Sequence, residues 1–116
     1  MWGADPWAMC MKHLNGEHLE MHMYAASMKK RRSIRGFIEK NEVDIRKIKE
    51  RHDALAKELA RRKNYGESAH KSPMPENPDY DYLPGELKAI KFNKDLSAKV
   101  LYDRCAECRK MAKNLM

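Results

Sequence analysis

The sequence predicts a small all-α domain. Apolar residues recur at helical spacing in three stretches, and no stretch alternates apolar and polar residues as a half-buried strand would. Prolines and glycines gather in one long stretch between the second and third helices. A length of 116 residues corresponds to one domain, which we place over 1–116. We therefore expect three main helices with a long proline-rich loop between the second and the third.

The first helix is expected over 7–30. Asp5 and Pro6 precede it, and Asp as a cap followed by Pro in the first turn is a typical helix start. Gly16 lies inside the helix and costs about 1 kcal/mol relative to Ala. We expect it to mark a bend or a close contact. The apolar residues at helical spacing are Leu14, Met21, Ala25 and Met28.

A turn is expected over 33–36, followed by a second helix over 42–63 with Asn41 as its cap. The basic residues at the end of this helix suit the negative end of the helix dipole. The stripe that faces the core consists of Val43, Ile45, Ile48, His52, Leu55, Leu59 and Ala60.

The stretch 64–84 is expected to be irregular, because it contains four prolines and three tyrosines. A loop this long in a small domain is typically functional or partly disordered. The third helix is expected over 94–113. Its apolar side consists of Leu96, Val100, Leu101, Cys105, Cys108 and Met111.

The formal net charge of +7 is concentrated in part of the chain. A dense basic cluster suits a polyanionic partner, above all nucleic acid. The basic residues over 46–63 are mixed with acidic ones, so a solvated helix face explains them equally well. The candidate phosphate-binding residues are Lys29, Lys30, Arg31, Arg32 and Arg35.

Several classes of protein are not expected. No apolar run is long enough to span a membrane, so a membrane partner is not expected. No secretory signal is visible, and three cysteines do not suit a disulfide framework, so we expect a cytoplasmic protein. Glycine-rich nucleotide-binding loops and the esterase motif G-x-S-x-G are also lacking.

One face of the first helix carries a candidate acid/base site. His13, Glu17, Glu20 and Tyr24 stand at i, i+4, i+7 and i+11, so on a helix they share a stripe. Two carboxylates and an imidazole together can transfer protons, which makes Glu17 and Glu20 candidate catalytic residues. The alternative is an ordinary solvent-exposed stripe.

The cysteines provide a second candidate site. Cys10-x-x-His13 and Cys105-x-x-Cys108 would together supply four ligands, as in many structural zinc sites. Alternatively, the cysteines are small buried hydrophobes. His13 can be a zinc ligand or an acid/base residue, but hardly both.

Two further histidines give only a weak indication of a metal site. His18 and His22 are four residues apart, which is the spacing of two metal ligands on a helix. The zinc-protease pattern requires Glu directly after the first His, and Leu19 stands there instead.

Three segments of the sequence resemble the pyrimidine-dimer DNA glycosylases, the small all-α repair enzymes of the endonuclease V type. They are KHLNGEHLEMH at 12–22, RHDALAKELARR at 51–62 and HKSP at 70–73. The resemblance is strongest over 5–75. It implies removal of one base of an ultraviolet-induced pyrimidine dimer, followed by nicking of the strand at the abasic site, without a cofactor.

The resemblance also implies which residues act. The α-amino group of the first residue, here Met1, would attack C1′ of the sugar and form a Schiff base. Glu20 would be the essential carboxylate and His13 the assisting imidazole. An α-amine has a pKa of about 7.7–8.0, so a useful fraction is neutral and nucleophilic at neutral pH.

The chain departs from the family's well-studied members at several positions. Leu19 and Met23 stand where those members carry Arg, and bulky Trp2 follows Met1, so the amine of Met1 itself would be the nucleophile. Cys105-x-x-Cys108 stands in place of an aromatic tail. Two alternatives therefore stay open, a non-catalytic DNA-binding module on the same helices and a zinc-stapled interaction protein.

Overall fold

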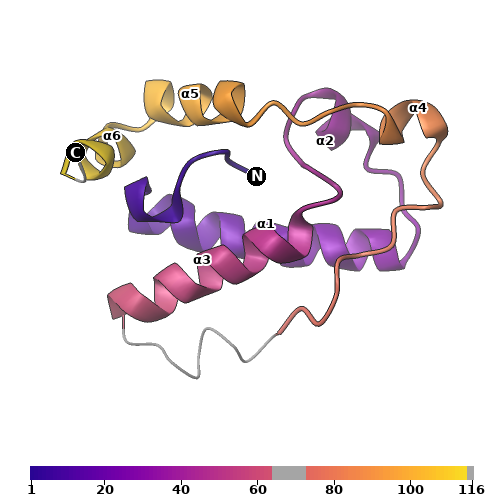
Figure 1. The fold of residues 1–116 in the computed structure, drawn as a ribbon, viewed down its shortest axis with the longest axis horizontal. Coiled ribbons are helices and arrows are strands. Elements are labelled where there is room, and N and C mark those ends of the chain that lie inside the picture. Colours follow the sequence, from indigo (N-terminus) through magenta and orange to yellow (C-terminus); the bar gives the residue numbers. More distant parts are fainter. Residues whose placement is uncertain (64–72, 115–116) are drawn as a thin grey trace.

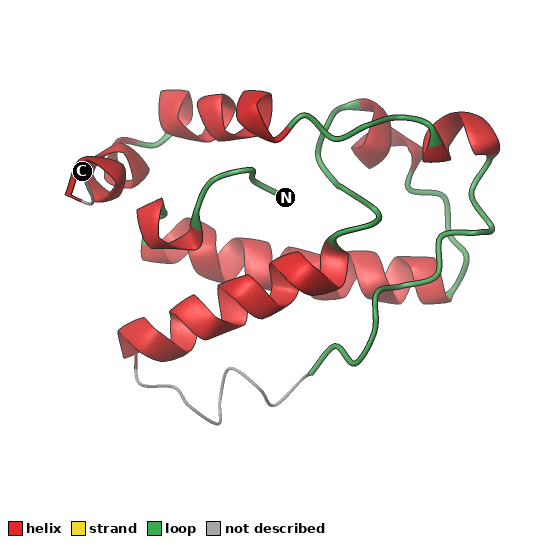
Figure 2. Cartoon of the chain, in the orientation of Figure 1, coloured by secondary structure: helices red, strands yellow, loops and turns green. Residues whose placement is uncertain are grey.

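The fold is all-helical, as the sequence predicts (Figures 1 and 2). The computed structural model describes residues 1–63 and 73–114, and this part of the chain contains no strand. A single 3-10 turn, η1 (Pro6–Ala8), precedes the α-helices. The α-helices are α1 (Met11–Lys29), α2 (Arg35–Glu39), α3 (Ile48–Lys63), α4 (Gly85–Lys88), α5 (Lys94–Arg104) and α6 (Ala106–Asn114).

Helices α1 and α3 pack against each other and form the centre of the domain. Leu14, Met21 and Met28 are spaced by seven residues, so they fall on one face of α1, and all three are buried. Leu55 and Leu59 are buried on α3. Figure 1 shows the N-terminal segment, residues 1–10, between this pair and α5. The start of the chain is therefore inside the molecule.

The first predicted helix is shorter than expected. Asp5 does act as a cap, since its side chain accepts a hydrogen bond from the Trp7 backbone N–H at 3.0 Å, but it caps only the 3-10 turn. Met9 and Cys10 have extended backbone angles, and α1 begins after Cys10. The expectation of a close contact at Gly16 is wrong, because a Cβ added there would meet nothing within 4 Å.

The second predicted helix begins at Ile48 instead of residue 42, and the short helix α2 replaces the expected turn at 33–36. Asn41 caps no helix. Its φ of 60° lies in the left-handed region that Asn tolerates, and its side chain exchanges two hydrogen bonds with the backbone of Asn93, at 2.9 and 2.7 Å. The segment that follows is non-helical, yet Val43 and Ile45 are buried as predicted.

The third predicted helix is divided in two. Cys105 has an extended backbone with φ −122° and ψ 108°, and this residue separates α5 from α6. In the expected loop, residues 64–72 lie outside the described part of the chain, and 73–84 contain no helix or strand. Tyr80 and Tyr82 of this segment pack against the core, beneath the guanidinium groups of Arg46 and Arg31. Among the described helices, none has the length and apolar character required to cross a bilayer.

Gly3 is expected to be essential for the docking of the N-terminal segment. A Cβ at this position would lie 2.0 Å from the carbonyl oxygen of Lys94 and 2.6 Å from its Cα, and these backbone atoms cannot move aside cheaply. We expect Gly3→Ala to lower the free energy of unfolding by about 1–3 kcal/mol, the usual cost of overpacking. Urea denaturation measures the change.

Gly16→Ala is the matched control for this substitution. Gly16 is exposed inside α1 and has open space around its Cα, so Ala should raise the free energy of unfolding by about 0.5–1 kcal/mol. A Gly3→Ala chain as stable as the wild type would show that the segment does not lie against Lys94.

Candidate functional site

The first candidate site is built around the amino group of Met1. This amine contacts the carboxylate of Glu20 on α1 and donates a hydrogen bond to the carbonyl oxygen of Glu42 at 2.7 Å. Tyr24 lies one turn after Glu20, and its hydroxyl is 3.3 Å from Glu20 Oε1 and 3.2 Å from the Glu42 carbonyl oxygen, so its single proton can be donated to either acceptor. An amine, a carboxylate, a phenol and a carbonyl therefore converge.

Burial and nearby charge determine the protonation state of the Tyr24 hydroxyl. Burial raises the pKa of Tyr24 far above its usual value, and the negative charge of Glu20 raises it further, so the hydroxyl stays protonated. Met1 is only 7% exposed, whereas the Glu20 side chain is 37% exposed. The carboxylate can thus exchange protons with the amine on one side and with solvent or a ligand on the other.

The N-terminal segment is held in place through its backbone carbonyls. It forms no regular ladder, so these carbonyls need other donors, and side chains of α3 and α5 supply them. Arg51 and Arg62 donate to Ala4 and Pro6 at 2.7 and 2.9 Å. Ser97 and Tyr102 donate to Met1 and Ala8 at 3.0 and 3.1 Å. These bonds fix the position of the amine relative to Glu20.

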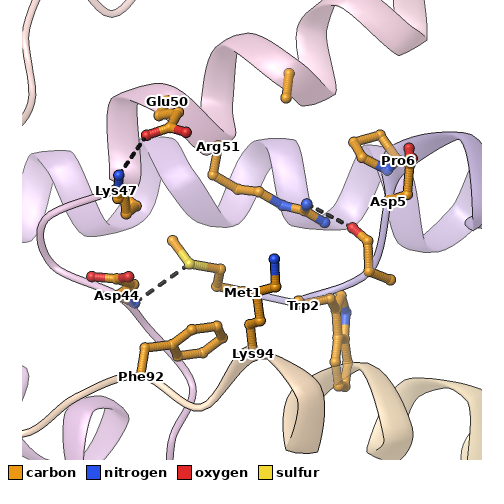
Figure 3. A pocket seen from close by; sticks show the side chains of 13 residues that line it. Met1, Trp2, Asp5, Pro6, Asp44, Lys47, Glu50, Arg51, Phe92 and Lys94 are labelled. Carbon is orange, nitrogen blue, oxygen red and sulfur yellow. Dashed lines mark hydrogen bonds and ion pairs between the residues drawn. The ribbon is translucent and has the colours of Figure 1, made fainter.

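Two pockets lie against Met1. The pocket on the Glu20 side has a volume of about 350 Å³, and the cations Lys40 and Arg104 line it. The larger pocket has a volume of about 620 Å³ and is shown in Figure 3, where the Met1 side chain lies among Asp44, Phe92 and Arg51. The Glu20-side pocket is therefore lined by the residue that carries the amine, by a carboxylate and by two cations.

Glu17 lies on the same helix but does not join this group. Its carboxylate pairs with Arg51 of α3 at 2.5 and 3.0 Å, and its side chain is fully buried. Arg51 also donates to the N-terminal segment. The geometry gives Glu17 a partner that ties α1 to α3, and its catalytic role stays a prediction.

His13 lies in the cysteine cluster. One ligand atom from each of the four residues lies within 4.8 Å of all the others. The Cys10 sulfur is 3.1 Å from His13 Nδ1 and 3.8 Å from the Cys105 sulfur, and Cys108 Sγ is 3.7 Å from His13 Nδ1. These residues can therefore hold a metal ion such as zinc.

Backbone N–H groups point at two of these sulfurs. Cys10 donates to Cys108 Sγ at 3.2 Å, and Cys108 donates to Cys105 Sγ at 3.4 Å. The hydrogen bond from the Cys108 backbone lowers the pKa of the Cys105 thiol, whereas burial raises the pKa of Cys108. The cluster joins the start of α1 to the junction of α5 and α6.

A third cluster consists of His18, His22 and His52, whose ligand atoms also lie within 4.8 Å of one another. The sequence pairs only the first two, and places His52 in the apolar stripe of the second helix. Burial lowers the pKa of His22, and the neighbouring His52 lowers it further.

The basic cluster surrounds the end of α1 and the start of α2, and all its members are exposed. Arg35 is occupied by Glu86 at 2.6 Å and by Glu39 at 3.6 Å. No ion pair within the described residues engages the other members, which are Lys29, Lys30, Arg31 and Arg32. Their charges are available to a polyanion.

Sequence reasoning missed the Glu42 carbonyl, Arg51 and Ser97, which position the amine. No sequence pattern identifies a carbonyl or a lone serine as part of a site, because only chain packing brings them there.

Comparison with known proteins adds nothing to this picture, since no family model, curated protein or solved structure matches the chain.

Proposed function

We propose that the protein is a cytoplasmic DNA glycosylase and abasic-site lyase. Its substrate would be double-stranded DNA that contains pyrimidine dimers or related base lesions. The amine of Met1 is the nucleophile and Glu20 is the residue that moves protons. The observation that carries the proposal is the contact between this amine and the Glu20 carboxylate, beside a pocket lined by cations.

The chemistry begins when Glu20 accepts a proton from the Met1 ammonium group and leaves a neutral amine. The lone pair forms a bond to C1′ of a flipped nucleotide while the bond to the base breaks, and the base takes the electron pair and a proton. The nitrogen then loses a proton, the C1′–O4′ bond opens and O4′ is protonated, which gives a protonated Schiff base.

Nicking follows from the same intermediate. Removal of a proton from C2′ expels the 3′ phosphate, and water then hydrolyses the Schiff base and releases the amine. Tyr24 and the Glu42 carbonyl hold the Met1 amine next to the Glu20 carboxylate. Lys40 and Arg104 are suitably placed for phosphates flanking the flipped nucleotide.

Binding of the duplex is assigned to the exposed basic cluster. Lysine and arginine side chains neutralise phosphates and release counterions, so affinity for duplex should fall steeply with salt. The assigned residues are Lys29, Lys30, Arg31, Arg32 and Arg35.

Borohydride trapping on duplex DNA with one abasic site tests the proposal. The native chain should become covalently linked, because borohydride reduces a Schiff base, and mass spectrometry should find the sugar on the Met1 nitrogen. A chain with two residues added before Met1 should trap at least about a hundredfold less, because its amine no longer reaches Glu20.

The other outcomes contradict the proposal. Equal trapping by the extended chain would mean that the amine of Met1 is not the nucleophile. A native chain that binds duplex DNA but is never trapped would instead be a non-catalytic DNA-binding module.

We also propose a structural zinc ion at Cys10, His13, Cys105 and Cys108, because their geometry favours it. Zinc held by such a set keeps its ligand atoms about 3.3–3.9 Å apart, close to the separations of 3.1, 3.7 and 3.8 Å between them. The ion would clamp the start of α1 to the junction of α5 and α6. In this proposal His13 is a zinc ligand and leaves the acid/base chemistry to Glu20.

Cobalt substitution and zinc analysis test this site. The wild type should contain zinc, and its cobalt form should show a thiolate-to-cobalt charge-transfer band. Cys105→Ser should bind cobalt more weakly, show a weaker thiolate band and melt at a lower temperature. Glu50→Gln, an exposed change on α3, should retain the wild-type band and melting temperature. A wild-type chain that shows no thiolate band with cobalt would exclude the site. Zinc binding without any affinity for DNA, even at low salt, would favour the interaction-protein alternative.

A further inference from the structure

Three histidines from two helices meet at the interface of α1 and α3. The rings of His18 and His22 are 5.0 Å apart between centroids, and the His52 ring lies 4.9 and 4.6 Å from them. His52 is 1% exposed, and the other two are half-buried. Charged imidazoles would repel one another at this separation, so the cluster requires neutral rings or a shared cation.

The ring of His52 is oriented by an acidic neighbour. His52 Nδ1 lies 2.9 Å from Asp53 Oδ1, and a carboxylate can only accept a hydrogen bond, so Nδ1 carries the proton. Asp53 is itself held by Lys49 Nζ at 2.5 Å. The lone pair of neutral His52 is therefore on Nε2, which faces His22 Nε2 at 3.1 Å. A carboxylate behind a ligating histidine is the usual second layer of a metal site.

The separations suit a small cation. Two imidazole nitrogens on one tetrahedral zinc ion lie about 3.3 Å apart, close to the distance between His22 and His52. His18 and His22 are one helical turn apart, so both can reach an ion in front of α1. Three imidazoles without thiolates or further carboxylates select late first-row divalent cations, such as zinc, cobalt, nickel or copper.

The site borders a pocket through His22. His22 lines a pocket of about 430 Å³ between the second half of α1 and residues 73–79. Three protein ligands with an accessible fourth position distinguish sites that hold an exchangeable ligand, such as water, from closed structural sites.

We propose that His18, His22 and His52 form a second metal site, for zinc or another late first-row divalent cation, separate from the cysteine cluster and with an open coordination position. The site depends neither on the lyase chemistry nor on the occupation of the cysteine cluster. It also links α1 to α3.

Cobalt titration of the metal-free protein separates the two sites. The histidine site should take up one equivalent with d–d absorption but without the thiolate charge-transfer band. His22→Gln should lose this equivalent and keep the one with the band. Asp53→Asn should weaken it about tenfold to a hundredfold, and Asn15→Gln, an exposed change on α1, should alter nothing.

Each outcome decides the question. The proposal would be overturned if the protein took up only the cobalt equivalent that shows the thiolate band. It would also be overturned if an equivalent without this band were still taken up by His22→Gln. If His22→Gln does not fold, nuclear magnetic resonance of the wild type replaces it. Zinc addition should then shift the imidazole signals of all three histidines, and unshifted signals would overturn the proposal. A single band-free equivalent would support this site and exclude the one at the cysteines.

Discussion

Glu20→Gln is expected to slow nicking of abasic-site DNA by at least about a hundredfold, within the usual range for loss of an acid/base residue. Gln retains the shape of the side chain and an oxygen that can accept from the Met1 amine, but it cannot take up the proton of the ammonium group. The affinity for duplex DNA should stay unchanged, because the basic cluster is untouched. Single-turnover nicking and fluorescence anisotropy measure the two quantities.

Glu107→Gln is the control, since it removes one exposed carboxylate on α6 at a distance along the chain from this site. It should nick like the wild type. If the Glu20→Gln variant nicks DNA at the wild-type rate, Glu20 moves no proton in the reaction. Equal loss of nicking and of DNA affinity would instead give Glu20 a structural role in holding the N-terminal segment.

Glu17→Gln is expected to lower the free energy of unfolding by about 3–5 kcal/mol, the typical cost of removing one partner from a buried ion pair. The side chain of Glu17 is fully buried and Arg51 is only 14% exposed, so the guanidinium would lose its counter-charge where little water can replace it. The same guanidinium anchors the N-terminal segment through Ala4. Urea denaturation measures the loss.

Glu50→Gln is the matched control on α3. Its pair with Lys47 is exposed, so the change should cost less than about 1 kcal/mol. The experiment also separates the two roles considered for Glu17. A Glu17→Gln chain of wild-type stability that no longer nicks DNA would make Glu17 catalytic, whereas an unstable chain whose folded fraction nicks normally would make it structural.

The helices themselves could be predicted from local patterns. The seven-residue spacing of Leu14, Met21 and Met28 identifies a buried helical face whatever packs on it, and α1 is where that pattern places it. The boundaries could not be predicted in the same way. α3 begins late, and the residues before it are tied to distant parts of the chain. Asn41 binds the backbone of Asn93, and Val43 and Ile45 reach the core without a helix.

The stripe of His13, Glu17, Glu20 and Tyr24 was also visible in the sequence, but the partners of its members were not. His13 meets the cysteines, Glu17 meets Arg51, and only Glu20 and Tyr24 meet the amine. Spacing along a helix fixes which side chains share a face, because the rise and the turn angle are constant. It carries no information about what lies opposite.

The sequence by itself thus determined the helical class, the basic cluster and the residues able to bind protons or metal. Only the tertiary structure decided how they are grouped, with the amine of Met1 at Glu20, His52 beside His18 and His22, and Cys10 and His13 beside Cys105 and Cys108. The reason is that each grouping joins segments distant along the chain. Such contacts depend on long-range burial and on hydrogen bonds to the N-terminal carbonyls, which no local pattern encodes.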